Sequence, residues 1–350
     1  MTSSPQKLSL PARTGMFVRD FVLSETVRYI TKRVLQGVLT LFLTSLLSFW
    51  IVQLAPGDFL TPFQQSEMSA DTIAGLRERY GLDRPLWTQY FFWLKQVLTE
   101  FDFGISFAYN RPALELLWER VPNTILLSAA SIFVTWAIAI PLGIIGAVNQ
   151  NRFIDRFIRL FSYGGQGIPT IITGLLLLFL AQRLTPLFPV GGRTSLYHDD
   201  LTWFGQVLDV AWHLILPTLA LSITSFAGLQ RLMRGQLLDV LRQDYIQTAR
   251  AKGLPENRVI YVHALRNAIN PLITILGFEF SNLLSGSFII ENYFSWPGLG
   301  RLTLEAVQQK DLFLTMASLV IGATMLIVGN LLADLALTMV DPRIKLSRLN

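Results

Sequence analysis

Few residues of this chain have the types and spacing that catalytic or metal chemistry requires. The three histidines, His198, His213 and His263, lie far apart without metal-type spacing, and the chain contains no cysteine. It has no Gly-x-x-x-x-Gly-Lys-Ser/Thr sequence to cradle nucleotide phosphates, and no Ser/His/Asp set is suggested. The sequence therefore predicts no catalytic residues and no metal site.

One ionisable residue lies near the middle of a long apolar stretch. Glu279 falls within residues 269–290, and Asn282 and Gly286 follow at i+3 and i+7, on the same face of a helix. Ionisable groups inside a membrane are costly and usually face a pathway or a partner. These three residues are candidates for lining a translocation pathway, where Glu279 would meet a substrate amine. The alternative is a hydrogen-bonded carboxyl that locks two helices together.

A basic stretch between two apolar segments, residues 237–271, is the second candidate site. Its helical pattern is cut at 253–255 by Gly-Leu-Pro and then resumes. Gly253 suits a left-handed helix stop, and Pro255 is tolerated in a new first turn. The pattern predicts a slim elbow of two short helices, with small residues at Ala249 and Ala251, that could press into a partner protein. The alternative is an ordinary basic loop.

Composition indicates a membrane protein. The 350 residues are 51% hydrophobic and only 15% charged, which is too apolar for an ordinary soluble domain. Crossing a bilayer takes about 20 apolar residues. Six windows meet that length: 34–54, 123–148, 157–181, 207–229, 269–290 and 312–340.

Charge distribution predicts the orientation of these six spans. Most of the 29 lysine and arginine residues fall on one side of the membrane if both termini and the elbow face the cytoplasm. The net charge of +5 then reflects membrane topology and not nucleic-acid binding. The first apolar run is too long for a signal peptide, so it is expected to remain as a signal-anchor helix.

The segments outside the spans divide into three. Residues 1–33 form a cytoplasmic N-terminal segment, 55–122 an external helical region, and 341–350 a cytoplasmic tail. In the external region, one helix starts at Pro85 with an aromatic stripe for structural packing, and another ends before Pro122. The glycines and proline of 294–302 predict a tight external turn that places Trp296 at the headgroup level.

Several strings resemble one protein family. They are QTARAKG at 247–253, HALRNA at 263–268, FSWPGLGRL at 294–302, PGD at 56–58 and VDPR at 340–343. They are similar to the permease subunits of dipeptide/oligopeptide/nickel-type ABC importers, specifically the subunit with a large external loop after its first helix. The first string resembles the family's EAA loop, with Gln247 and Thr248 replacing the Glu-Ala of the general motif. The resemblance extends from about residue 28 to the end.

The resemblance implies a channel-forming, non-catalytic subunit in the bacterial plasma (inner) membrane. Its implied partners are a homologous second permease subunit, two cytoplasmic ABC ATPase subunits, an external solute-binding protein and membrane lipid, but no nucleic acid. ATP and Mg would bind to the ATPase subunits, and this chain would hold no cofactor. The residues implied to couple the chain to the ATPases are Asp244, Tyr245, Thr248, Ala249, Arg250, Ala251, Lys252, Gly253 and Leu254.

The expected fold is an all-α polytopic membrane protein with six transmembrane helices, a small external helical region and a cytoplasmic coupling elbow. Helix 1 would span 34–54, and helices 2–6 would lie within 123–340, with the coupling loop at 230–268. A self-sufficient secondary transporter or channel is the alternative, but it would need coupling-ion carboxylates in broken helices and usually two related halves. An intramembrane enzyme is a third alternative, but the sequence lacks the nucleophile or the metal ligands that such an enzyme would need. The sequence does not identify the solute.

Overall fold

The computed structural model describes residues 25–54, 74–75, 77–78, 81, 83–184 and 187–340. Within that set, the side chains of 25–28, 274, 277–286 and 333–340 are not described. The expected N-terminal segment up to residue 24, the start of the external region at 55–73 and the tail at 341–350 lie outside the described residues. Every regular element in the described part is a helix, as the all-α prediction requires.

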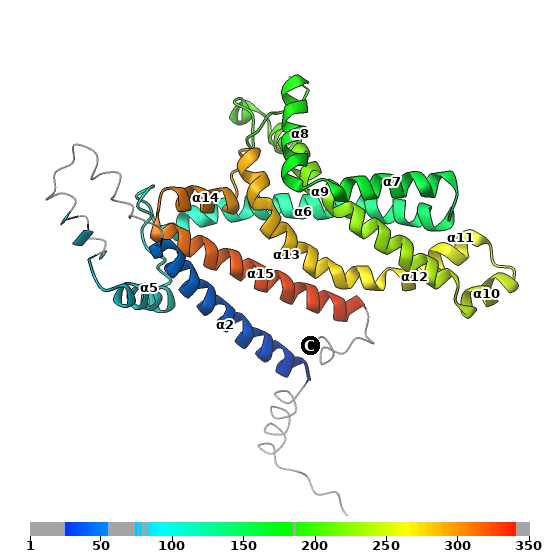
Figure 1. Ribbon diagram of the computed structural model, residues 1–350, viewed down its shortest axis with the longest axis horizontal. Helices are drawn as coiled ribbons and strands as arrows, with labels where there is room; N and C mark the ends of the chain where they lie inside the picture. The colour runs from blue at the N-terminus through cyan, green and yellow to red at the C-terminus, as the bar shows by residue number, and fades with distance from the viewer. Residues whose placement is uncertain are drawn as a thin grey trace, which may run out of the picture.

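Long helices dominate the chain (Figure 1). They are α2 Glu25–Leu54, α6 Ala113–Val148, α9 Trp203–Leu241, α13 Asn270–Tyr293 and α15 Leu312–Val340. In the described residues, four of them contain windows long and apolar enough to cross a membrane, on α2, α6, α9 and α15. A bent helix pair makes a fifth candidate. The described residues therefore support four or five of the six expected spans.

The external helix and the second span are one helix, which corrects the prediction of a break at Pro122. Helix α6 runs through both Pro122 and Pro141 for 36 residues. A proline inside a helix destabilises the helix by about 3 kcal/mol, because it removes one backbone hydrogen bond and its ring clashes with the preceding turn. Contacts on both sides of Pro122 keep the helix straight enough to continue. Leu117 is buried before it, and Asn123 after it donates from Nδ2 to the carbonyl of Pro297 at 2.8 Å.

The expected third span is not one straight helix. It is divided into α7 Phe153–Gly167 and α8 Thr170–Arg183, which are bent by 100° at the break. Ile168 is extended there, with φ −99° and ψ 121°. The residue before a proline avoids the helical region, so Pro169 forces this break. In Figure 1, α7 runs beside α6 and α9, whereas α8 projects away from them.

Small hydroxyl residues line the contact between α6 and α9. The buried ones are Ser128, Ser131, Thr135, Thr218 and Ser222. Ser222 Oγ donates to the carbonyl of Ser131 at 3.2 Å. Small side chains let two helix backbones approach closely, which favours packing in a membrane.

A second packed region joins the beginning and the end of the chain. Helices α5 Leu86–Glu100 and α14 Leu299–Gln308 contribute to it, together with α2 and α15. The predicted aromatic stripe of α5 is only partly buried. Tyr90 and Trp93 are buried, and Trp93 Nε1 donates to the carbonyl of Phe103 at 3.1 Å. Trp87 is exposed. Asp311, fully buried, accepts from Ser106 Oγ at 2.6 Å and so attaches residues 102–111 to the start of α15.

The segment 294–302 is a buried connection, and the depth of Trp296 in the membrane stays a prediction. Trp296 is fully buried, and its Nε1 donates to the carbonyl of Asn123 at 3.0 Å. Glu291, also fully buried, accepts from Thr124 Oγ1 at 2.7 Å and from the Arg301 N–H at 3.1 Å. A Cβ at Gly298 would lie 2.3 Å from this carboxyl. Glycine is required here because the carboxyl of Glu291 occupies that space.

Candidate functional site

The elbow has the geometry that its sequence predicts. Helix α10 Asp244–Ala251 is followed by Gly253 at φ +75°, and helix resumes after Pro255. The Gly253 N–H bonds the carbonyl of Arg250 at 2.9 Å, and the Leu254 N–H bonds that of Ala249 at 3.3 Å. These two bonds form the Schellman arrangement that ends a helix with a left-handed residue.

The second limb of the elbow connects directly to α13. It consists of α11 Glu256–Arg258, the π-helical turn η2 Val259–Ala264 and α12 Leu265–Ala268. Wide π turns within helices occur frequently at functional sites. Only Ile269 separates α12 from α13, so no loop lies between the elbow and α13.

One side of the elbow packs against the body of the protein. Ile246 is fully buried, Ala249 is 8% exposed, and both join a cluster with Leu237, Val259 and Ile260. Burying an aliphatic side chain of this size stabilises a fold by about 1.5–3 kcal/mol. This packing holds α10 against α9 and η2. Of the two small residues proposed to keep the elbow slim, Ala249 therefore lies on the inner face and Ala251 on the outer.

The opposite side of the elbow is open. The exposed residues among those implied for coupling are Asp244, Tyr245, Thr248, Ala251, Lys252 and Gly253, and Arg250 and Leu254 are half-buried. Two neighbours on η2, Tyr261 and Val262, are more than half exposed and were not identified from the sequence. They lie in a run of apolar residues that resembles an ordinary helix core, so only the structure reveals their exposure.

Two side-chain contacts connect the two limbs across Gly253. Arg250 donates from Nε and Nη2 to the carboxylate of Glu256 at 3.1 and 2.6 Å. This hydrogen bonding holds the pKa of Glu256 below its ordinary value. Asn267 Nδ2 donates to the Tyr245 hydroxyl at 2.8 Å. Since the ion pair is largely exposed, it contributes at most about 1 kcal/mol, and it mainly fixes the angle of the elbow.

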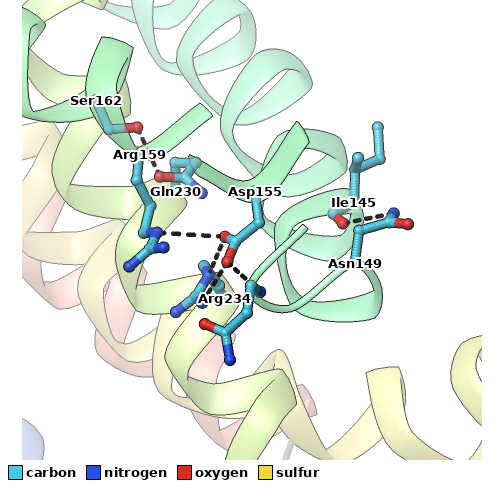
Figure 2. Close-up of polar contacts among 8 residues, drawn as sticks. Ile145, Asn149, Asp155, Arg159, Ser162, Gln230 and Arg234 are labelled. Atoms are coloured by element: carbon cyan, nitrogen blue, oxygen red, sulfur yellow. Dashed lines mark hydrogen bonds and ion pairs between the residues drawn. The ribbon is translucent and has the colours of Figure 1, made fainter. Parts of the chain in front are cut away.

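A buried ion pair fixes the stretch of α9 that leads into the elbow (Figure 2). Asp155 at the start of α7 is fully buried and accepts from Arg234 Nε and Nη2 at 2.7 and 2.9 Å. The Asn151 N–H donates to the same carboxylate at 2.9 Å. This pair was not predicted from the sequence. The only indication of it in the sequence is that Asp155 is a single aspartate among arginines, between two apolar windows.

The candidate pathway residues all belong to α13. A helix places Glu279, Asn282 and Gly286 on one face, because i, i+3 and i+7 lie within one stripe. Their side chains are outside the described part of the structure, so the choice between pathway lining and helix locking stays a prediction.

Two of the three histidines meet through one carboxylate, although they are distant in the sequence. The Asp209 carboxylate lies 2.7 Å from His198 Nδ1 and 3.3 Å from His213 Nδ1, and it accepts the Ser195 N–H at 2.9 Å. In the part of the chain that the structure describes, no group of three His, Cys, Asp or Glu side chains, this one included, is arranged so that it could hold a metal ion. This cluster attaches the segment after α8 to α9.

Comparison with known proteins assigns the family. The family described as "Binding-protein-dependent transport system inner membrane component" matches residues 139–346, and its N-terminal counterpart matches 26–128. The chain is 40% identical to the oligopeptide transport system permease protein AppB of Bacillus subtilis (strain 168), over 91% of this chain and 99% of that protein. It is 35% identical to the dipeptide transport system permease protein DppB of Escherichia coli (strain K12), with the same coverage.

A chain of the inward-facing MetNI methionine ABC transporter is also similar in structure, with a TM-score of 0.48 and 15% identity over 65% of this chain and 97% of that one. The two family matches include the elbow, the buried 294–302 connection and most of the long helices. The chain therefore belongs to the binding-protein-dependent transport system inner membrane components and is a multi-pass membrane permease subunit.

Proposed function

We propose that this chain forms, with a homologous second permease subunit, the channel of an ABC importer for peptides or a related small solute. The observation that carries the proposal is the match of 91% of the chain to nearly full-length permeases whose names specify oligopeptide or dipeptide transport. The exposed face of the elbow supplies a surface for ATPase subunits. ATP and Mg would bind to those subunits, and this chain would hold no cofactor.

In the proposed topology, six spans cross the membrane, and α7 and α8 together supply the third. Both termini and the elbow face the cytoplasm, where the basic residues concentrate. Residues 55–122 are external, so the packed region formed by α5, α14 and the end of α2 faces the solute-binding protein. Residues 1–33 and 341–350 are the two cytoplasmic ends.

The proposed mechanism is alternating access. Closure of the two ATPase subunits moves the elbow, and the continuous path from α10 through η2 and α12 transmits that displacement to α13. The buried contact of α10 with η2 makes the elbow move as one unit. Helix α13 carries the candidate pathway residues, so its shift would open the solute path to the cytoplasm.

Reporter fusions test the topology. A reporter fused after Asp341 is expected to be cytoplasmic, and one inserted at Gln65 is expected to be external, because the intervening spans are odd in number. A second insertion at the exposed Arg193 serves as a further external control. Activity of the Asp341 and Gln65 reporters on the same side of the membrane would contradict the six-span arrangement.

Substitution of Glu279 tests the pathway. If its carboxyl meets a cationic solute, Glu279→Gln is expected to weaken uptake of cationic peptides more than uptake of neutral peptides, at unchanged protein level. The charge is lost while the shape and the hydrogen-bonding capacity are largely kept. The measurement is uptake of matched cationic and neutral peptides by cells with equal amounts of permease. An equal effect on both would assign Glu279 to helix packing alone.

A further inference from the structure

The contact between α7 and α9 has a large excess of positive charge. Three arginines belong to it, Arg159 from α7 and Arg231 and Arg234 from α9, and Arg152 and Arg156 are exposed at the start of α7. Across residues 149–167 and 223–238 the only acidic residue is Asp155. Its carboxylate is bonded to Arg234 on both oxygens and to the Asn151 N–H (Figure 2). One carboxylate therefore cannot balance the remaining guanidinium groups.

Buried donors in this contact lack acceptors. Arg159 Nε lies 3.6 Å from Asp155 Oδ1, beyond hydrogen-bond distance, and has no hydrogen-bond partner. Arg231 Nη1 and the amide nitrogen of Gln230 also have no hydrogen-bond partner, and Gln230 is fully buried. A buried donor without an acceptor costs about 1–3 kcal/mol, and more where the group is charged. Arg159 Nε and Arg231 Nη1 are charged donors of this kind on the two facing helices, so an anion with several oxygens would satisfy both.

Arg159 and Arg231 are both neighbours of Tyr163. Arg159 and Tyr163 are four residues apart on α7 and share a face. The Arg231 guanidinium lies 5.1 Å from the centre of the Tyr163 ring, and it donates a hydrogen bond to Gln166 one turn further along. Stacking on an aromatic face and a fixed hydrogen bond orient a guanidinium for bidentate recognition of a phosphate.

An apolar stripe adjoins the arginines. Phe153, Phe157 and Phe161 follow at intervals of four residues along α7, with ring centres 6.2 and 4.6 Å apart, and Phe153 is 82% exposed. Leu160 is 70% exposed. A helix with an apolar stripe beside basic residues fits the boundary between lipid acyl chains and headgroups. The stripe therefore favours a membrane lipid over a free anion as the ligand.

We propose that α7 and α9 form a binding site for one anionic phospholipid, whose phosphate contacts Arg159 and Arg231 and whose acyl chains lie along the α7 phenylalanines. The site rests on the proposed topology, which places it in the cytoplasmic leaflet, and is independent of the solute. Basic pockets between membrane helices on that side are suited to anionic headgroups. A bound lipid would link α7 to the part of α9 that leads into the elbow.

Native mass spectrometry of the purified full chain in detergent tests this site. Phosphatidylglycerol and phosphatidylcholine are titrated separately against the wild type, the Arg159→Gln/Arg231→Gln variant and the Arg159→Lys/Arg231→Lys variant. Arg193→Gln, which removes the same charge from the segment between α8 and α9, is the matched control. Inorganic phosphate is added in a separate series to identify a free-anion site. Circular dichroism checks that each variant is folded.

The wild type is expected to bind phosphatidylglycerol more tightly than phosphatidylcholine. Each arginine near an anionic headgroup changes affinity about fivefold, so the double glutamine variant is expected to bind roughly 20- to 30-fold more weakly. The lysine variant keeps the charge but not the bidentate fork, so it should bind more weakly than the wild type and more tightly than the glutamine variant. Arg193→Gln should resemble the wild type. Equal affinity of the wild type and the folded glutamine variant would overturn the proposal, as would displacement of the lipid by millimolar phosphate. None of these readouts depends on transport.

Discussion

Valine at position 253 is expected to abolish transport and solute-stimulated ATP hydrolysis by the assembled complex while leaving the chain in the membrane. Gly253 has φ +75°, where a β-branched residue is strained by about 1–3 kcal/mol. No atom lies within 4 Å of the Cβ position, so the effect comes from the backbone and not from a clash. Relief of the strain would break the Schellman bonds and change the angle between the two limbs.

The matched control for this variant is Gly253→Asn. Asparagine adopts the left-handed region more readily than other non-glycine residues, so it should retain most of the coupling. The measurement is ATPase activity of the reconstituted complex with its binding protein, in the presence and absence of solute. Full stimulation of the valine variant would show that the elbow is a passive loop.

Asp155→Asn is expected to lower the stability of the protein by about 3 kcal/mol. The substitution leaves the Arg234 guanidinium, whose side chain is only 16% exposed, without a counter-charge, and breaking one partner of a buried pair is strongly destabilising. For a chain of this size, that loss corresponds to a decrease in Tm of roughly 5–10 °C. Thermal unfolding followed by tryptophan fluorescence measures the decrease.

A double variant separates the ion pair from simple packing. Asp155→Asn/Arg234→Gln removes both charges, so the buried guanidinium that causes the instability is absent. Its Tm should recover at least half of the loss seen in Asp155→Asn. A double variant as unstable as the sum of the two single variants would indicate that the residues act independently.

Local signals in the sequence predicted the elbow correctly. Gly253 and Pro255 act through their own backbone preferences, which do not depend on distant residues, so the helix stop and restart could be predicted before any packing was known. The helix starting after Pro85 was predicted for the same reason. Helix α15, too, coincides with its expected span, because an uninterrupted apolar run leaves little choice of boundary.

Predictions failed where tertiary contacts decide the outcome. Pro122 reads as a helix boundary, yet neighbouring contacts such as that of Asn123 carry α6 through it. The burial of the Trp296 indole was not predicted either, because it depends on a contact with Asn123 on α6. Pro169 was accommodated within a single span in the prediction, whereas the structure breaks there.

The candidate sites show the same division. The sequence located the elbow but did not reveal which side faces outward, since the exposure of Tyr261 and the burial of Ala249 follow from packing against α9. The pair of Asp155 and Arg234 joins residues on two helices, and no local pattern specifies such a contact. Glu279 was identifiable because a charge within an apolar window is conspicuous in any sequence.

Site-directed cross-linking tests directly whether the exposed face of the elbow contacts an ATPase subunit. The chain has no cysteine, so Ala251→Cys on the exposed face and Arg193→Cys far from it each introduce a unique thiol. A photoactivatable thiol reagent is attached to each variant before assembly with the ATPase subunits. We expect an adduct of permease and ATPase from position 251 and none from position 193. An adduct from position 193, or none from 251 in a complex that still transports, would contradict the proposed coupling.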